Sequence, residues 1–501
     1  VARVISRLAP WSTRGGVRRE GDAGRLAPSE PSDLDRLMET IEAGSGESLE
    51  PLPRSDWVSR LIPEWDHLRC LPHEALFHSH PVDIHAWRTV DEVAFAMKDD
   101  RERTGTMEAA EQVGDRRQIL LAALLHDMGK GHEGDHSQVG AVIAERFAAR
   151  AGLDPETGWR LAQAVRHHLL IPNVATRRDI ADAKVIRETA AAVRDSRMLH
   201  LLYVLSVADS RACGPDVWSP WRAQLMQTLY LRVLDLLRSQ KPAGETAGAL
   251  RNEILATLSG SFGRREVEDH LAGLSPSYVL STPPEVVGTH LRLIADAAGG
   301  TAVHHDLNGP VDRLTIVTPD RPGILALVAG TLASHNVNVL GGSAFTRDDG
   351  IAIEVFYVGD ALGHGIDERR WTRVTKALPE ALEGRVDVEQ RLAETRRAYR
   401  AAASPRVPIE TTVLVDNVAS EAYSIVEVNT LDRLGLLYSI TQALSRRGLN
   451  IHLAKVDTIG PEVVDAFYVQ TAGGGRVDSQ PDVAGVKEAV LAAVRELDAQ
   501  P

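Results

Sequence analysis

An apolar run leads into the most distinctive motif of the chain. The residues from Ile119 to Leu125 are all apolar, so this segment lacks the polar face of a helix that lies on a protein surface. The pattern predicts a helix buried inside a helical bundle. His126 and Asp127 follow directly, and Lys130 lies in the Gly-Lys turn after them. Titratable groups at such a place are costly unless they are paired or bind metal.

The hydrophobic pattern changes in the second half of the chain. Residues 241–310 carry Gly, Pro and Ser between short helical stretches and predict a helical connector. A short β-branched strand at 314–317 then runs into an Asp-Arg-Pro-Gly turn. Apolar residues at helical spacing predict a helix from Ile324 to Ser334, and further strands follow it.

This pattern of strand, turn, helix, strand, turn and strand occurs twice. The segment Asp-Arg-Pro-Gly-Ile-Leu at 320–325 returns as Asp-Arg-Leu-Gly-Leu-Leu at 432–437. In the same way, Val-Asn-Val at 337–339 returns as Leu-Asn-Ile at 449–451. The internal repeat therefore predicts two copies of one α+β module.

Composition excludes several classes of protein. The 501 residues are 44% hydrophobic and 25% charged, with a net charge of −13. This acidic balance argues against a nucleic-acid surface, which needs concentrated Lys and Arg. Cys70 and Cys213 are the only cysteines, which excludes a thiolate zinc site and a disulfide framework. No apolar stretch reaches the roughly 18 residues of a membrane helix. We therefore expect a cytoplasmic protein that binds neither nucleic acid nor membrane.

More histidines and carboxylates lie near predicted helices, as the ligands of a metal site would. They are His85, His136, His167, His168 and Asp209. A single histidine of this kind is more often a satisfied core residue, but imidazole and carboxylate together suit a hydrolytic metal site with open positions. Asp135 could orient a ligand ring or simply lie in an exposed loop. Lys130 could steady a phosphate oxygen or remain a solvated turn lysine.

The order of these residues resembles the HD-domain metal-dependent phosphohydrolases over roughly residues 60 to 240. The resemblance implies a divalent metal, Mg or Mn, and hydrolysis of a phosphate ester in which Asp127 and Lys130 take catalytic roles. The primary metal ligands that it implies are His85, His126, Asp127 and Asp209. Asp127 would bridge two ions, and the candidates for the second ion are His136, His167 and His168.

The repeated module resembles the ACT domain, a small βαββαβ unit of the ferredoxin-like class that binds amino acids. Gly323 and Gly435 would let the backbone approach a carboxylate at a helix start, where free N–H groups attract anions. The other candidate contacts of an amino-acid effector are Asp320, Asn338, Asp432 and Asn450. Asp320 and Asp432 could instead only cap their helices.

A helical HD bundle followed by two ACT modules resembles part of the bifunctional uridylyltransferase and uridylyl-removing enzymes, which modify the nitrogen-signalling protein PII. The resemblance runs from about Trp57 to the end. It includes Leu-Ile-Pro-Glu-Trp at 61–65, Val-Arg-His-His-Leu-Leu at 165–170 and Val-Ala-Asp-Ser-Arg-Ala at 207–212. It implies that the chain removes UMP from uridylylated PII and that the ACT domains sense glutamine.

The front of the chain departs from that family. Ser32-Asp33-Leu34-Asp35 superficially offers the carboxylate pair of a nucleotidyltransferase, but no room remains for a third carboxylate before the HD region. Apolar residues at helical spacing instead predict a helix over 33–43. We therefore expect the nucleotidyltransferase domain to be missing or truncated, and we expect no uridylyltransferase activity from this chain.

The predicted fold class is multidomain, with an all-α HD-type bundle followed by two ferredoxin-like ACT modules. The expected segments are an N-terminal tail and helix at 1–56 as a remnant of a larger region, the HD domain at 57–240, the helical connector at 241–310, the first ACT domain at 311–385, a linker at 386–412 and the second ACT domain at 413–501.

Two other functions fit the same residues. The chain could be an HD phosphohydrolase that acts on a free nucleotide under amino-acid control, because the pocket walls cannot be read from the sequence. It could also be a noncatalytic amino-acid sensor that uses the bundle only as a scaffold. The intact set of ligands argues against the sensor, since a decayed site would have lost at least one of them.

Overall fold

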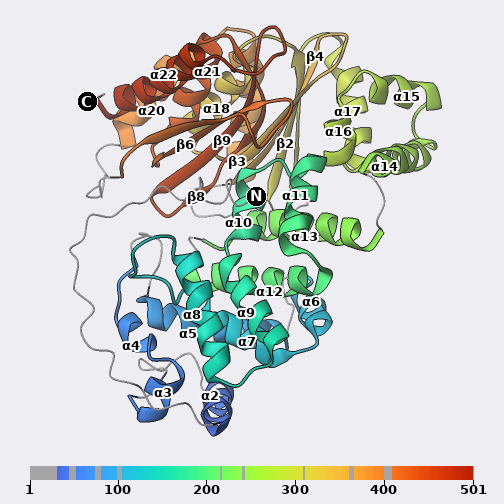
Figure 1. Ribbon diagram of the computed structural model, residues 1–501. Helices are drawn as coiled ribbons and strands as arrows, with labels where there is room; N and C mark the ends of the chain where they lie inside the picture. Colours follow the sequence, from blue (N-terminus) through green and yellow to red (C-terminus); the bar gives the residue numbers. More distant parts are fainter. Residues whose placement is uncertain are drawn as a thin grey trace. The chain divides into compact units, whose positions relative to one another are not determined.

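The computed structural model divides into two compact units (Figure 1). Unit 1 contains Val1–Ala175 and Ile186–Ser239, and unit 2 contains Thr176–Val185 and Gln240–Pro501. The structure describes residues 31–43, 52, 54–73, 80–98, 104–214, 217–239, 243–307, 311–359, 366–399 and 409–499. Among these residues, no helix is long and apolar enough to cross a membrane.

Unit 1 is helical throughout its described part. Its helices are α2 (Pro31–Ala43), α3 (Asp56–Leu61), α4 (Trp65–Leu68), α5 (Val82–Ala96), α6 (Thr106–Val113), α7 (Arg116–Leu125), α8 (His136–Arg150), α9 (Pro155–Arg166), α12 (Ser196–Cys213) and α13 (Pro220–Ser239). Two more helices, α10 (Leu170–Arg177) and α11 (Ala183–Val193), have one end each in the short segment that belongs to unit 2.

Helix α7 is the buried helix that the apolar run predicts. The Asp115 side chain begins it by accepting hydrogen bonds from the backbone N–H groups of Arg117 and Gln118. Every residue from Gln118 to Leu125 is buried, and α7 packs against α5 and α12. The predicted helix over 33–43 is also present as α2.

Unit 2 contains a helical connector and one continuous sheet. The connector and module helices are α14 (Ala243–Leu258), α15 (Arg264–Ala272), α16 (Pro276–Ser281), α17 (Pro284–Ala297), α18 (Ile324–Ser334), α19 (Glu368–Leu382), α20 (Val388–Tyr399), α21 (Leu436–Arg446) and α22 (Gln480–Ala499). The strands are β1 (Ala302–Asp306), β2 (Asp312–Pro319), β3 (Asn338–Thr346), β4 (Ile351–Gly359), β5 (Thr412–Asp416), β6 (Ser424–Leu431), β7 (Leu449–Lys455), β8 (Thr458–Ile459) and β9 (Glu462–Thr471).

The sheet joins the two repeats edge to edge. Its strand order is β1-β2-β4-β3-β7-β9-β6-β5, with β8 beside β9, and all its pairs are antiparallel. Strands β3 and β7 form the junction, where Ser343 lies opposite Leu453. In each repeat the edge strand, β1 or β5, precedes the other strands along the chain, so the connection order is ββαββα. The order of the strands within each half of the sheet is still that of a ferredoxin-like sheet.

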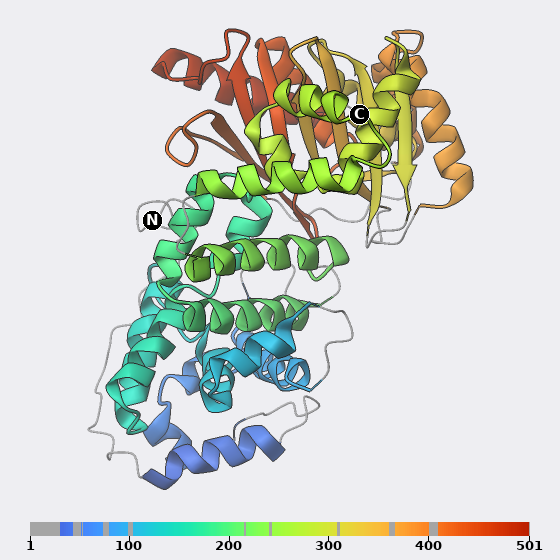
Figure 2. The same ribbon diagram turned by 90° about the vertical axis from the view of Figure 1, so that its right-hand side faces the viewer.

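Helices cover one face of the sheet across both repeats and the other face over the first repeat (Figure 2). On one face α18, α19, α21 and α22 bury a shared apolar core that includes Phe356 and Phe467. On the other face α14, α15, α16 and α17 pack against Ile353 and Val355 of the first repeat. Because neighbouring residues of a strand point to opposite faces, the fully covered strands read as continuous apolar runs.

The short segment of unit 2 from Thr176 to Val185 is bound to the second repeat. The buried Arg178 forms ion pairs with Glu427 and Asp416. The backbone N–H of Asp179 donates a hydrogen bond to the Tyr468 hydroxyl at 2.7 Å. These contacts explain why the segment belongs to unit 2 although α10 begins and α11 ends in unit 1.

Candidate metal centre

Six of the predicted metal ligands come together in unit 1. Each is held within a helix or just beyond the end of one. They are His85 in α5, His126 and Asp127 after α7, His136 at the start of α8, His168 after α9 and Asp209 in α12. Helices from distant parts of the sequence thus bring imidazole and carboxylate groups to one place.

The two carboxylate oxygens of Asp127 face different histidine pairs. Oδ2 lies 3.8 Å from His85 Nε2 and 3.3 Å from His126 Nε2. Oδ1 lies 3.8 Å from His136 Nε2 and 3.7 Å from His168 Nε2. Asp127 thus forms a first group of potential ligands with His85 and His126, and a second group with His136 and His168. Within each group the ligand atoms lie within 4.8 Å of one another. A carboxylate shared in this way is suited to bridging two metal ions.

Asp209 completes the first group. Its Oδ1 lies 2.9 Å from His85 Nε2 and 3.5 Å from His126 Nε2. Cys213, one helical turn later in α12, forms a third potential ligand group with His85 and Asp209. Cys213 was not among the predicted ligands, although its spacing of four residues from Asp209 places both on one face of a helix. Burial raises the pKa of the Cys213 thiol and favours its protonated form.

Two histidines are oriented as metal ligands usually are. Nδ1 of His126 lies 2.7 Å from the Ala123 carbonyl oxygen, and Nδ1 of His168 lies 2.7 Å from that of Val165. Each Nδ1 must donate its hydrogen to the carbonyl, so each ring directs Nε2 at the cluster, where this atom can bind a metal ion when it carries no hydrogen. Nε2 of His126 is buried without a hydrogen-bond partner. Burial also lowers the pKa of His168 to about 3, which favours its neutral form.

The charge balance of the cluster favours a cation. Burial would lower the pKa of His126, but the negative charges of Asp127 and Asp209 raise it to about 10. Burial would raise the pKa of Asp127, but Lys130 and His126 hold it well below its usual value. The site thus stabilises positive charge between the buried carboxylate of Asp127 and the partly buried one of Asp209, and these residues fit a divalent ion.

Lys130 is fixed at the edge of this cluster. Its ammonium Nζ lies 2.8 Å from Asp127 Oδ2 and 2.9 Å from His73 Nδ1. His73 was not predicted, because nothing in its local sequence distinguishes it from a surface histidine. The lysine is therefore not a freely solvated turn residue, and it lies where it can contact a substrate oxygen.

The glycine of the motif is required by close packing. A Cβ atom at Gly129 would lie 2.0 Å from the His136 carbonyl oxygen and 2.6 Å from the Gly140 backbone nitrogen. The absence of a side chain at Gly129 lets the first turn of α8 pack directly against the backbone of this glycine, and this packing places His136 near Asp127. Asp135 is the N-cap of α8 and accepts a hydrogen bond from the Ser137 N–H at 2.9 Å, a role that differs from both readings of its sequence context.

Some predicted site residues lie outside the cluster. His167 belongs to none of the ligand groups, and its lowered pKa follows from burial and from the charges of Arg166 and Arg194. Asp33 is buried in α2, with Arg60 Nη2 3.0 Å from its Oδ1. The Ser-Asp-Leu-Asp segment therefore uses this carboxylate in an ion pair.

The predicted effector residues of one repeat do not all lie together in the structure. Gly323 and Gly435 begin α18 and α21 with φ of +88° and +80°, which glycine adopts readily. Thr346 donates a hydrogen bond to Asp320 at 3.3 Å, so Asp320 lies at one end of β3 and Asn338 at the other. Because β7 runs antiparallel to β3, Asn450 at its start lies toward the Asp320 end of β3, across the junction.

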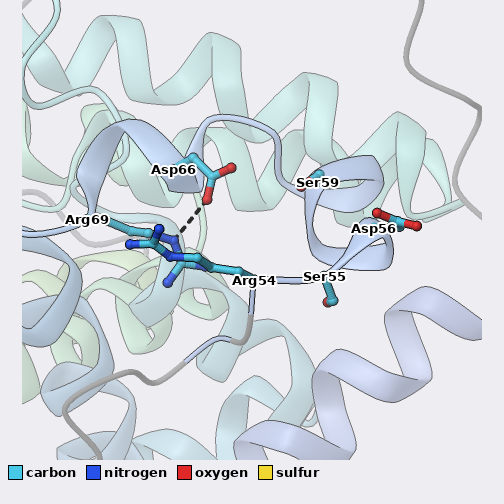
Figure 3. A pocket seen from close by; sticks show the side chains of 6 residues that line it. All are labelled: Arg54, Ser55, Asp56, Ser59, Asp66 and Arg69. Atoms are coloured by element: carbon cyan, nitrogen blue, oxygen red, sulfur yellow. Dashed lines mark hydrogen bonds and ion pairs between the residues drawn. The ribbon is translucent and has the colours of Figure 1, made fainter.

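A separate surface hollow lies beside α3 and α4 (Figure 3). It contains none of the clustered histidines. Arg69 in its wall is held by Asp66 at 2.8 Å and by the Leu52 carbonyl oxygen at 3.0 Å. Its lining residues are Arg54, Ser55, Asp56, Ser59, Asp66 and Arg69.

Known protein families match the two parts of this architecture. The HD domain model matches residues 103–212, which contain most of the cluster, and the ACT domain model matches residues 313–363, within the first repeat. The chain carries an HD domain and an ACT domain. With the cluster described above, this indicates a metal-dependent phosphohydrolase with a regulatory domain.

Curated relatives of this HD–ACT chain share one description. The chain is 32% identical over 468 residues to the bifunctional uridylyltransferase/uridylyl-removing enzyme of Rhodospirillum rubrum, a match that covers 90% of this chain and 49% of that protein. Enzymes of the same description from Gluconobacter oxydans and Azospirillum brasilense are 31% and 32% identical, over 97% and 98% of this chain and 53% and 54% of theirs. The predicted resemblance is confirmed, and the chain spans about half the length of these relatives.

Proposed function

We propose that this chain hydrolyses the phosphodiester that joins UMP to a tyrosine of the signalling protein PII, under the control of glutamine. The observation that carries the proposal is the position of Asp127 between two histidine pairs, with Lys130 beside it. The description of the relatives as uridylyl-removing enzymes supports the choice of substrate.

Each clustered residue has a role in this proposal. His85, His126, Asp127 and Asp209 would hold a first divalent ion, Mg²⁺ or Mn²⁺, and His136 and His168 would hold a second together with Asp127. When bound, the ions lower the pKa of water and offset the charge of the phosphoryl group. Lys130 binds a non-bridging phosphate oxygen. Water adds to phosphorus, the bond to the tyrosine oxygen breaks, and the proton ends on that oxygen.

The ACT modules supply the regulation. An α-amino acid carries a carboxylate, which the exposed N–H groups at a helix start can bind. Gly323 and Gly435 are the N-cap residues of α18 and α21, and Asp320 and Asp432 lie three residues before them. Glutamine is the effector that this proposal assigns to the modules.

The decisive experiment measures UMP release from uridylylated PII by the purified chain with Mn²⁺, with and without glutamine. Release that depends on the metal and responds to glutamine supports the proposal. Asp127→Asn and His126→Ala should abolish release, whereas His167→Ala, a neighbouring histidine outside the cluster, should retain it. Absence of release by the parent chain, or equal release by Asp127→Asn, would contradict the proposal.

A parallel assay with free nucleotides separates the two hydrolase hypotheses. Uridylylated PII and a series of free nucleoside phosphates are offered to the same preparation. Preference for the protein-linked diester supports uridylyl removal, and turnover of free nucleotides alone supports the other hydrolase. A noncatalytic sensor would turn over neither substrate.

A further inference from the structure

The two ACT modules are related repeats, but their helix starts have different surroundings. Gly323 and Gly435 occupy equivalent positions before α18 and α21, and both have left-handed backbone conformations. The helices themselves pack against each other. If the site were the same in both modules, the two helix starts would have the same neighbours. Their neighbours differ.

In the second module, α20 fills the space beside the helix start. A Cβ atom at Gly435 would lie 2.6 Å from Arg396 Nη2 and 2.7 Å from Leu392 Cδ2. The Arg396 side chain donates hydrogen bonds to the carbonyl oxygens of Leu434 at 3.0 Å and Gly435 at 3.4 Å. Leu392 is fully buried. The chain itself therefore closes this position.

In the first module, the equivalent position is open. A Cβ atom at Gly323 would have one neighbour within 4 Å, the Ser445 hydroxyl oxygen at 3.4 Å. Asp320, Arg321 and Pro322 are exposed. Ser445 belongs to the second module, and Asp320 is close enough to His452 of that module to affect its pKa. A ligand at this helix start would contact both modules.

A buried acid of the same module lies close enough to Asp320 to feel its charge. Glu354 in β4 is 5% exposed, and its Oε2 has no hydrogen-bond partner. Its neighbours on the same face of β4, Ala352 and Phe356, belong to the core that contains α18. Burial and the charge of Asp320 raise the pKa of Glu354 to about 8, as expected of an acid without a cation beside it.

The second module has an equivalent acid in Asp465. It precedes Phe467 by two residues in β9, as Glu354 precedes Phe356 in β4. Asp465 is also buried, with Oδ1 unpartnered, and burial and Asp432 raise its pKa well above the usual value. Both modules thus have a buried acid, Glu354 or Asp465, whereas the helix start is open in the first module and closed in the second.

We propose that the first ACT module is the effector site of this chain, where α18 binds the carboxylate of an amino acid and Asp320 and Glu354 bind its ammonium group. Helix α20 closes the second site through Arg396 and Leu392, so one effector molecule binds per chain. This inference rests on the proposed control by an amino acid and extends it to a named module, a binding residue and a stoichiometry.

The test is isothermal titration calorimetry of the full chain with L-glutamine. We expect one site per chain and at least about tenfold weaker binding of glutaramate, which keeps the carboxylate and amide but lacks the ammonium group. Glu354→Gln should weaken glutamine binding by at least about tenfold and remove most of the discrimination against glutaramate. Asp465→Asn is the matched control and should bind glutamine like the parent.

A second variant tests the same site without altering the acid. Ser445→Leu places a bulky group beside Gly323 and should also weaken glutamine binding, while thermal unfolding confirms that each variant is folded. Two equal sites, no glutamine binding by the parent, unchanged binding by Glu354→Gln, or an equal loss in Asp465→Asn would overturn the inference. UMP release is measured on the same samples. Release without glutamine binding overturns this inference and the proposed control by glutamine but leaves the hydrolase standing, and binding without release overturns only the proposed hydrolase.

Discussion

The ammonium nitrogen of Lys130 lies 2.8 Å from the Oδ2 atom of Asp127, which also faces His85 and His126. The lysine therefore contacts the one carboxylate that both histidine pairs share. Its positive charge holds the pKa of Asp127 low and keeps that carboxylate ionised. A substrate phosphate at the cluster would meet this cation at the edge of the site.

Replacement of Lys130 by methionine should reduce hydrolysis more than metal binding. Loss of a charged contact to a phosphoryl group in the transition state lowers the rate by roughly a hundredfold. UMP release measures this effect, and the Mn²⁺ content after dialysis shows whether the ligands are intact. Lys376→Met, which removes an exposed lysine of α19, is the control and should change neither quantity.

The shared carboxylate predicts different metal contents for two variants. Asp127→Asn removes a ligand from both groups, so bound Mn²⁺ should fall toward zero. His136→Ala removes a ligand of the second group only, so the content should fall from two ions per chain to one. Elemental analysis of the purified variants checks this order. Equal losses in both variants would show that the two groups do not bind ions separately.

Local signals account for the elements that were predicted well. The apolar residues before His126 predict α7, and the Asp-Arg-Pro-Gly turn with the apolar spacing after it predicts α18, because caps and periodicity act within a few residues. Strand β1 was not predicted. Its sequence Ala-Val-His-His-Asp has no strong strand signal, and pairing with β2 defines it.

Distant contacts account for the parts of the site that were missed. His73 joins the cluster through Lys130, 57 residues away in the sequence. Asn338 and Asp320 lie in one repeat, but β3 separates them and β7 brings Asn450 to the Asp320 side. Pairing between repeats cannot be read from the pattern within one repeat.

Gly129→Ala should destabilise unit 1 and weaken the metal centre. The new Cβ would overlap the His136 carbonyl, so α8 must move away from the motif. Overpacking of this kind costs on the order of 1–3 kcal/mol. Thermal unfolding and Mn²⁺ content measure both effects. Gly248→Ala, in α14 with nothing within 4 Å of the new atom, should be neutral or slightly stabilising.

Stability should fall with rising pH because of Glu354. Its pKa is about 8 in the folded protein and near the ordinary 4.5 when unfolded, so the folded state holds a proton that the unfolded state has lost between these values. The contribution of Glu354 to stability is complete below pH about 4.5 and is lost as the pH rises through about 8.

Glu354→Gln tests this titration by denaturant unfolding at pH 5 and pH 8.5. The variant should gain stability relative to the parent as the pH rises, by about 1.4 kcal/mol for each unit of pKa difference. The exposed Glu285→Gln in α17 should show no such gain. A parallel pH dependence in the parent and Glu354→Gln would show that Glu354 titrates normally.

The junction between β3 and β7 has a consequence for self-association. A module cut away at this junction would expose an unpaired strand, Asn338–Thr346 or Leu449–Lys455, as a template for other chains. In the intact sheet the outer strands β1 and β5 are each only five residues long. Joining the repeats therefore conceals the longer edges and leaves short ones, which protects the pair of modules from aggregation.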